Sequence, residues 1–434
     1  MKAVLKNLES IILPWANLIV AISYVIAFYI AYVYFLNFHF SYLGYDILPG
    51  RDQKDFSLIL TFILSILPML LYRGVIGISS FLCIFIYFLL YVPIIITYHF
   101  SIDGSKLYIF YQQSLFVLGM TLLFVADRIQ LRNAFSLKVD KNLFPVILVV
   151  TILCTLYLMI LYRKNLRIVS FSDVYDLRSE NSKLGGDVIT GYLSAWLVNV
   201  FIPLNFGYAL FSKKWTYYLI GTFSCVIVYM ATGAKTAVVF PIASYLVYKL
   251  FTKVNLKYAF FNFGLFLSSV TAILTIMEFN IISSLLLMRT IGNGGDLTRH
   301  YHDFFLTHPH TYFSHVNIIN ALTQMYPYDD TLGVTIGAYY WGETNVNANF
   351  WATDGYAAVG SFGVLLASLI MFFVFLIFNN ISKSYNKVFL IVVLIPYLTM
   401  FLNASIFQSL LTGGAIFTFL FLSFSSNKKN KHIL

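Results

Sequence analysis

Charged residues are scarce in this chain. Asp, Glu, Lys and Arg make up only 11% of its 434 residues, whereas hydrophobic residues make up 59%. A soluble domain of this size needs a more polar surface, so the composition excludes one. Runs of ~20 apolar residues form helices that cross a hydrocarbon core of ~30 Å. The composition therefore predicts an all-α membrane protein whose helices face lipid and one another.

Cysteine is also scarce. The only three, Cys83, Cys154 and Cys225, each lie inside an apolar run. This excludes a disulfide framework and predicts small, buried, hydrophobic side chains. The first apolar run is too long for a signal peptide and lacks a small-residue cleavage site, so we expect it to remain as an anchor.

The apolar runs predict a polytopic helix bundle of about 12 transmembrane helices. Residues 1–434 would then form a single integral membrane domain. The predicted spans lie near residues 11–36, 56–72, 75–98, 108–126, 144–162, 192–211, 215–231, 236–252, 258–278, 356–378, 388–402 and 406–424.

The formal net charge of +10 could suggest a nucleic-acid partner, but its distribution indicates membrane topology instead. When the N-terminus is placed in the cytoplasm, the inner segments are short and hold most of the Lys and Arg residues and few acids. The positive-inside rule then predicts that both termini are cytoplasmic. We therefore expect a membrane and no nucleic acid as a partner.

One long polar segment, residues 280–354, separates the ninth and tenth predicted spans. It holds five of the eight histidines, and we expect it to be one large periplasmic loop in which the chemistry takes place. Its start, Ile281 to Met288, is apolar and short and is typical of a helix lying in the membrane interface. Its many aromatic residues suit either sugars, which have an apolar CH face, or an interfacial aromatic belt.

The spacing of the motifs rejects a P-loop and does not favour a zinc site. A P-loop requires Gly-x4-Gly-Lys-Ser/Thr, but in Gly233-Ala234-Lys235-Thr236 an alanine precedes the lysine and Tyr229 replaces the first glycine. The segments His300-x-His302 and His308-x-His310, followed by His315, match no standard zinc spacing. We expect these histidines to be solvated or to contact sugar, and we expect no metal.

Cations at the mouths of spans are candidates for function. Arg289 ends the apolar run from Ile281, and Lys235 lies between two predicted spans. Ionisable groups at membrane depth are costly and usually functional, although at span ends they can extend into the headgroups. A guanidinium holds phosphate oxygens in a fork, as recognition of a lipid diphosphate would require.

Several short motifs occur in a consistent order along residues 170–365, and with them the chain resembles the bacterial O-antigen and capsule repeat-unit polymerases of the Wzy type. The motifs are Tyr175-Asp176-Leu177-Arg178, Gly233-x-Lys235-Thr236, Arg289-x-x-Gly292, Tyr301-x-x-Phe304-Phe305, Asn349 with Asp354-Gly355-Tyr356, and Gly360-x-x-Gly363. The histidines of residues 300–315 match no general pattern of that family.

This resemblance implies a GT-C-like glycosyltransferase of the bacterial inner membrane that needs no cofactor. A hydroxyl of one undecaprenyl-diphosphate-linked oligosaccharide attacks the anomeric carbon of another, and undecaprenyl diphosphate leaves. It also implies a chain-length regulator protein as a partner. The implied substrate-binding residues are Arg178, Lys235, Arg289, Arg299, Tyr301 and Asn349. The candidates for the base that accepts the hydroxyl proton are His310, His315, Glu343 and Asp354.

Two alternatives stay open. An O-antigen ligase uses the same donor and a similar loop but transfers to a lipid core. A lipid-linked oligosaccharide flippase or other transporter also fits the number of spans, although transporters usually place ionisable and broken-helix elements near the midplane.

Overall fold

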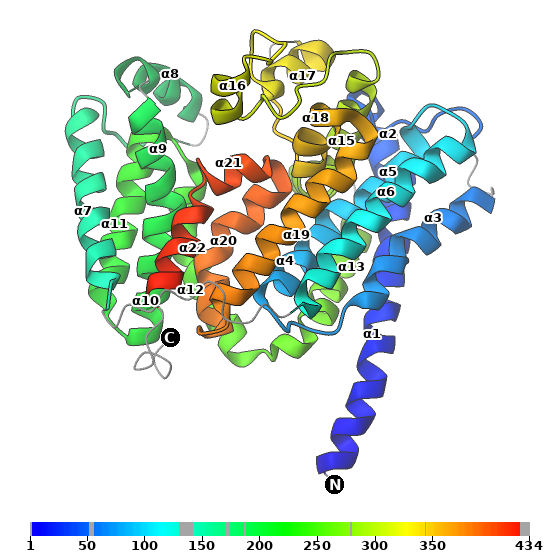
Figure 1. Cartoon of the computed structure of the whole chain (residues 1–434), viewed down its shortest axis with the longest axis horizontal. Helices are drawn as coiled ribbons and strands as arrows, with labels where there is room; N and C mark the ends of the chain where they lie inside the picture. Colours follow the sequence, from blue (N-terminus) through cyan, green and yellow to red (C-terminus); the bar gives the residue numbers. More distant parts are fainter. Residues whose placement is uncertain are drawn as a thin grey trace. The chain divides into compact units, whose positions relative to one another are not determined.

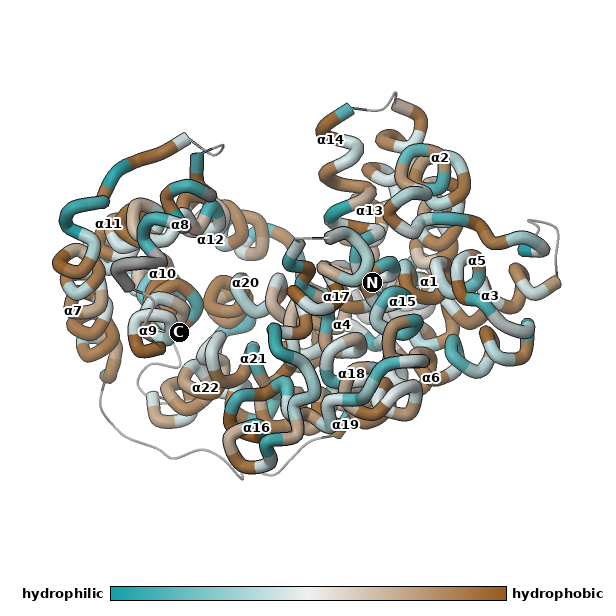
Figure 2. The backbone as a smooth tube through the Cα atoms, turned by 90° about the horizontal axis from the view of Figure 1, so that it is seen from above, coloured by the Kyte–Doolittle hydropathy of each residue, from teal (hydrophilic) through white to brown (hydrophobic). Residues whose placement is uncertain are grey.

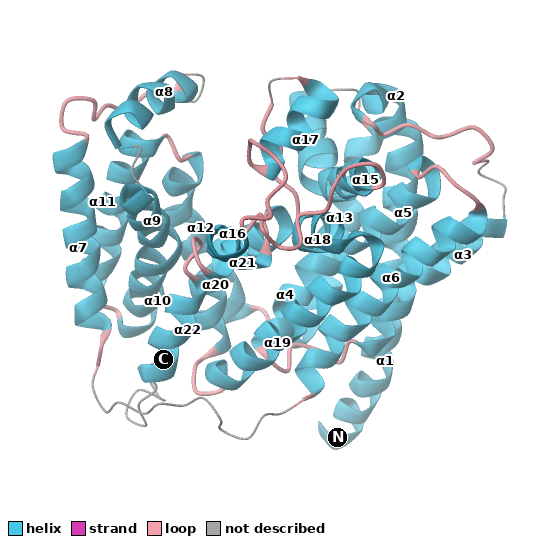
Figure 3. Cartoon of the chain, turned by 45° about the horizontal axis from the view of Figure 1, so that its top comes forward, coloured by secondary structure: helices cyan, strands magenta, loops and turns pink. Residues whose placement is uncertain are grey.

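The structure, a computed structural model, describes residues 2–51, 56–129, 142–170, 173–185, 188–277, 280–342 and 344–425. Every regular element in these ranges is a helix, and none is a strand (Figure 3). The all-α prediction is therefore confirmed for the described chain. The three cysteines are buried and free, as expected.

Several helices are long and apolar enough to cross a membrane. By length and composition there are eight of these in the described residues: 12–43, 78–101, 106–128, 144–161, 188–212, 215–232, 256–276 and 351–382. Three shorter apolar helices cover 56–71, 387–403 and 415–424. Figure 2 shows hydrophobic residues, in brown, along most of these helices. The chain thus has the character of a polytopic helical membrane protein, while the count of about 12 spans stays a prediction.

The last predicted span is wrong as a single helix. Residues 406–424 form α21 (Ile406–Leu410) and α22 (Ala415–Phe424), and the chain turns between them. Gly414 has a φ of 78°, a left-handed conformation that glycine adopts without steric cost. The hydropathy of the run is continuous, but α21 ends at Leu410 and Gly414, the N-cap of α22, lies in the turn that separates the two helices.

The chain divides into two compact units. Unit 1 comprises residues 1–130, 256–376 and 401–406, and unit 2 comprises residues 131–255, 377–400 and 407–434. The main helices of unit 1 are α1 (Lys2–Ala31), α3 (Phe56–Ile66), α4 (Ile78–Ile86), α5 (Val92–Ser101), α6 (Lys106–Val125), α13 (Ala259–Ile276), α15 (Asn293–Phe305), α16 (Asn317–Thr323), α17 (Leu332–Trp341) and the start of α19 (Gly363–Ser382). Those of unit 2 are α7 (Phe144–Leu161), α8 (Val174–Gly185), α9 (Val188–Trp196), α10 (Ile202–Ser212), α11 (Trp215–Thr232), α12 (Lys235–Lys253), most of α20 (Lys387–Asn403), and α22.

Unit 1 is built around α15. This helix packs along α5, while α1 packs along α13 (Figure 1). The approach of α15 to α5 is close, because a Cβ on Gly295 would lie 2.7 Å from the carbonyl oxygen of Pro93. Only glycine fits there, so the sequence Gly294-Gly295 allows a polar helix to be enclosed by apolar ones.

Three π-helical segments of unit 1 contact α15, and a fourth packs on one of them. Segment η8 (Ser284–Gly292) runs directly into it, η4 (Tyr87–Tyr91) packs against both, η9 (Trp351–Tyr356) packs on α15, and η1 (Tyr32–Leu36) packs on η8. The helix predicted to begin at Ile281 is present as α14 (Ile281–Ser283) and η8. π-helical turns occur frequently at functional sites. Their grouping here favours a functional site near α15.

Unit 2 has an apolar core formed mainly by α7, α10, α11 and α12. Fully buried side chains such as Leu158 and Phe206 pack there. Its buried polar contacts join neutral groups: Asn205 donates to Thr151 (2.7 Å), and Thr155 donates to Ser224 (2.8 Å). These bonds tie α10 and α11 to α7.

Candidate functional site

The segment predicted to be one wet loop is largely helical, and part of it is buried. On α15 the side chains of Asp296, His300 and His302 are buried, with residue exposures of 4%, 3% and 1%. The sequence predicted that the histidines would be solvated or contact sugar, and for these two the structure gives internal partners instead. Asp and Arg residues on the same helix provide those partners.

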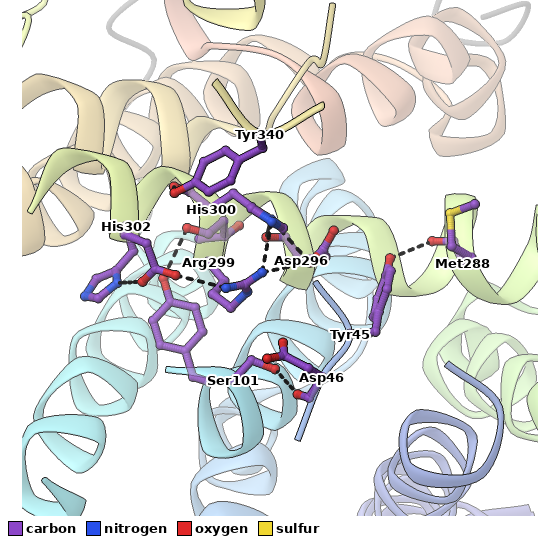
Figure 4. Close-up of polar contacts among 12 residues, drawn as sticks. Tyr45, Asp46, Ser101, Met288, Asp296, Arg299, His300, His302 and Tyr340 are labelled. Carbon is purple, nitrogen blue, oxygen red and sulfur yellow. Dashed lines mark hydrogen bonds and ion pairs between the residues drawn. The ribbon is translucent and has the colours of Figure 1, made fainter. Parts of the chain in front are cut away.

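Arg299 lies at the centre of this group (Figure 4). Its Nη1 donates to Asp303 Oδ2 at 2.9 Å, and its Nη2 lies 3.8 Å from Asp296 Oδ1 and 2.9 Å from His300 Nε2. Burial opposes the charge of the guanidinium, but the neighbouring carboxylates of Asp296 and Asp303 outweigh it and raise the pKa of Arg299. Arg299 is thus an internally neutralised cation.

The hydrogen bonds of His300 indicate which tautomer its ring adopts. A guanidinium can only donate, so Nε2 of His300 accepts from Arg299 and the ring proton lies on Nδ1. That Nδ1 is 2.9 Å from the carbonyl oxygen of Asp296. The rings of Tyr340 and Trp341 lie 4.5 and 4.6 Å from the imidazole and cover it.

His302 extends the network to α6. Its Nδ1 lies 2.8 Å from Asp303 Oδ1, and its Nε2 lies 2.8 Å from the hydroxyl of Tyr108. The ring of Tyr356 stands at 5.2 Å, and its hydroxyl donates to Gln112 (2.9 Å). A continuous polar network therefore joins α15, η9 and α6 within unit 1.

A second centre is Asp354 on η9, whose side chain is fully buried (0% exposed). Its Oδ1 accepts from Ser405 Oγ (2.6 Å) and lies 3.0 Å from His315 Nε2, while Oδ2 accepts from the backbone N–H of Ile406 (2.6 Å). Three donors around one carboxylate compensate for its burial. Asp354 thus joins η9, the 311–315 turn and the turn that begins α21.

His315 and His310 differ in what their ring nitrogens contact. Nε2 of His315 faces Asp354 and its Nδ1 lies 3.0 Å from Thr311 Oγ1, so both nitrogens are engaged. The Nδ1 of His310 is buried and has no hydrogen-bond partner among the described residues. Its ring packs against Phe305 at 5.8 Å. Of the two histidines, only His310 has an uncommitted nitrogen.

Glycine keeps space beside His310. Gly360, which ends the short helix α18 (Ala357–Val359), has a φ of 71°, and a Cβ there would lie 3.3 Å from Nε2 of His310. The Gly360-x-x-Gly363 motif of the sequence therefore coincides with a turn that passes directly over this imidazole.

Asn349 and Tyr301, both predicted to bind substrate, lie inside unit 1 with exposures of 1% each. Asn349 Nδ2 donates to Thr298 Oγ1 (2.7 Å), and its Oδ1 accepts from the N–H of Trp351 (3.0 Å), so it ties η9 to α15. Burial raises the pKa of Tyr301. The structure gives Asn349 an internal bonding role, and substrate contact by either residue stays a prediction.

The other predicted cations occupy different settings. Arg178 on α8 donates to the carbonyl oxygens of Thr232 (3.2 Å) and Gly233 (3.0 Å), at the C-terminal end of α11. Lys235 is exposed at the first position of α12. Both belong to unit 2. Arg289, on η8 in unit 1, is exposed and has no hydrogen-bond or ion-pair partner in the described part of the chain.

The remaining base candidate, Glu343, lies outside the described residues. Sequence reasoning missed Thr311 and Ser405, whose contacts order His315 and Asp354. The signal for Ser405 was a short polar turn, Asn403-Ala404-Ser405, between two apolar runs.

In the residues described, no group of three or more His, Cys, Asp or Glu side chains is arranged to hold a metal ion.

Comparison of the chain with protein-family models, with curated proteins and with solved structures gave no match. The functional conclusion therefore rests on the residues and on their geometry.

Proposed function

We propose that this protein polymerises undecaprenyl-diphosphate-linked oligosaccharide repeat units into O-antigen or capsular polysaccharide at the periplasmic face of the bacterial inner membrane. One observation carries the proposal: a buried Asp354–His315 pair orders the turn that holds His310, a histidine with an uncommitted ring nitrogen. A glycosyl transfer to a hydroxyl needs such a base.

In the proposed step the acceptor hydroxyl oxygen forms a bond to the anomeric carbon of the donor sugar. The bond between that carbon and the diphosphate oxygen breaks, and undecaprenyl diphosphate leaves with the electron pair. The hydroxyl proton passes to His310. His315 and Asp354 position the turn, because their polar atoms already have protein partners. Glu343 stays an alternative base.

Arg289 is the cation best suited to the diphosphate. The helical segment on which it lies has an outward apolar face at its start, with Ile281 85% and Leu285 51% exposed. An apolar face followed by an unpartnered guanidinium matches a ligand with a polyprenyl tail and a diphosphate head. Arg178, Lys235 and Arg299 stay further candidates, although Arg178 and Arg299 already donate to protein acceptors.

A transporter is the second candidate, and one observation favours it. Asp296, Arg299, His300 and His302 lie on a helix packed inside the bundle, and ionisable residues so placed often line a translocation pathway. An O-antigen ligase would use the same donor chemistry as the polymerase.

Deletion of the gene in its source bacterium distinguishes these functions. We expect surface glycan capped with a single repeat unit, since ligation continues when polymerisation stops. Gel electrophoresis of extracted glycan shows the band pattern, and the wild-type gene in trans should restore the ladder. Complete loss of the single-unit band would contradict the polymerase and favour the ligase or the flippase.

A further inference from the structure

Two consecutive aromatic residues have an unusual backbone. Tyr312 and Phe313 have φ values of 48° and 65°, the left-handed region that crowds any residue with a Cβ. Among the described residues only Lys213 and Gln324 are other non-glycine residues with positive φ, and each is the C-cap of a helix. Helix capping accounts for those two but not for the pair at 312–313.

The surrounding structure holds this turn in place. The N–H groups of Thr311 and Tyr312 donate to the carbonyl oxygens of Ala357 (2.7 Å) and Ala358 (3.0 Å). The N–H of Ser314 donates back to Thr311 (2.8 Å). The Asp354–His315–Thr311 contacts act on the same turn. Strained conformations that are held this firmly concentrate at ligand-binding sites.

The consequence of the strain is the placement of the Tyr312 ring. Thr311 and Ser314 are buried, whereas Tyr312 is 55% exposed. Its hydroxyl donates to no group in the described part of the chain. The ring stands at 83° to the imidazole of His310, with 6.4 Å between centroids. An open aromatic face and an uncommitted imidazole nitrogen therefore belong to the same turn.

We infer that Tyr312 is a sugar-binding residue for the acceptor oligosaccharide. Its ring takes the apolar CH face of a pyranose, its hydroxyl bonds to the hydroxyl rim, and the sugar lies beside His310. The transfer that follows rests on the proposed function, but the binding of sugar does not. The ring of Phe313, the second strained residue, lies 6.2 Å from that of His315.

The test uses the full-length protein in lipid nanodiscs and, as probe, the free repeat-unit oligosaccharide released from its lipid carrier by mild acid. Binding is measured by isothermal titration. Tyr312→Leu should weaken binding at least tenfold and Tyr312→Phe about threefold, since the ring persists and one hydrogen bond is lost. Tyr339→Leu is the matched control, because Tyr339 is also exposed (58%) but lies on the regular helix α17.

A further variant distinguishes the effect of the strained backbone at Tyr312 from the effect of sugar binding by its ring. Asn tolerates the left-handed region, so Tyr312→Asn should keep or raise the melting temperature and lose sugar binding. In elongation assays Tyr312→Leu should raise KM for the acceptor and leave kcat nearly unchanged. Wild-type binding by Tyr312→Leu, or equal weakening by Tyr339→Leu, would overturn the inference. A marked fall in the melting temperature of Tyr312→Asn would also do so, since the ring would then serve packing.

The outcomes also separate this inference from the proposed function. Tyr312-dependent sugar binding by a protein that does not elongate repeat units would contradict the polymerase and support the sugar site. Normal elongation by Tyr312→Leu with a wild-type KM would contradict the sugar site and support the polymerase.

Discussion

The two units differ in what they bury. In unit 1 the buried side chains include five ionisable ones, His99, Asp296, His300, His302 and Asp354. In unit 2 the buried polar residues that the structure describes are Ser, Thr and Asn only. Burial of an ionisable group costs free energy unless it is paired and hydrogen-bonded. Unit 1 bears this cost at several positions, as is typical of ionisable residues that have a functional role.

Two arginines, one in each unit, show the same difference between the units. Arg299 in unit 1 is surrounded by carboxylates and an imidazole, whereas Arg178 in unit 2 donates to the carbonyl groups at the end of α11. Carbonyl groups at a helix C-terminus carry only partial negative charge. Arg178 therefore resembles a helix cap, and Arg299 belongs to a charged network.

The largest expected effect is that of Arg299→Met, which leaves Asp296 and Asp303 without their cation. Removal of one partner from a buried ion pair typically costs about 3–5 kcal/mol. We expect little folded protein, measured by size-exclusion chromatography and thermal unfolding in detergent. Adding Asp296→Asn and Asp303→Asn should recover part of the loss. A triple variant no more stable than Arg299→Met would show that the ion pairs are not the cause.

Arg289→Ala should abolish most polymer formation and leave folding unchanged. The residue is exposed, and removal of one preorganised charge contact typically costs ~10²–10³ in rate, or about 3–4 kcal/mol. Arg289→Lys should lose much of the activity, because an ammonium cannot hold two phosphate oxygens in a fork. Polymer length is compared in cells with equal amounts of membrane protein. Full-length polymer from Arg289→Ala would mean that the residue only anchors the helix in the headgroups.

Asp354→Asn tests whether the buried pair in unit 1 serves the reaction. The amide keeps nearly the same shape, but its Nδ2 must face one of the three donors that now surround the carboxylate. The 311–315 turn should shift, and a displacement of this kind can lower kcat by about 10²-fold. The matched control is Thr155→Val in unit 2, which removes the bond to Ser224 and should leave kcat unchanged. Equal losses of kcat in both variants would remove the functional distinction between the units.

Local patterns in the sequence predicted the all-helical membrane character but not the site. Apolar runs of span length predicted most helices, because hydropathy is a property of consecutive residues. The same reasoning treated α15 as part of a wet loop, since polar residues ordinarily face water. Its burial depends on partners in three dimensions and on Gly295, which admits the backbone of α5.

The rest of the site could not be predicted because its residues are far apart in the sequence. His315 and Ser405 meet Asp354 across 39 and 51 positions, and no spacing rule on a single chain connects them. His310, His315 and Asp354 were each predicted as base candidates, but only geometry separates an engaged imidazole from an uncommitted one. The strained turn at Tyr312 left no signature in the sequence.

The smallest expected effect is that of Arg178→Met in unit 2. Two hydrogen bonds to the last carbonyl groups of α11 are lost, but Gly233 still ends the helix in its left-handed conformation (φ 62°). Loss of such a cap costs about 1 kcal/mol, against about 3–5 kcal/mol for Arg299→Met. Because the substitution is the same in both units, the ratio of the two losses measures how differently the two units use an arginine side chain. Thermal unfolding gives both values under identical detergent conditions. A loss of polymer from Arg178→Met at an unchanged melting temperature would assign this arginine to substrate binding and reject the helix-cap role.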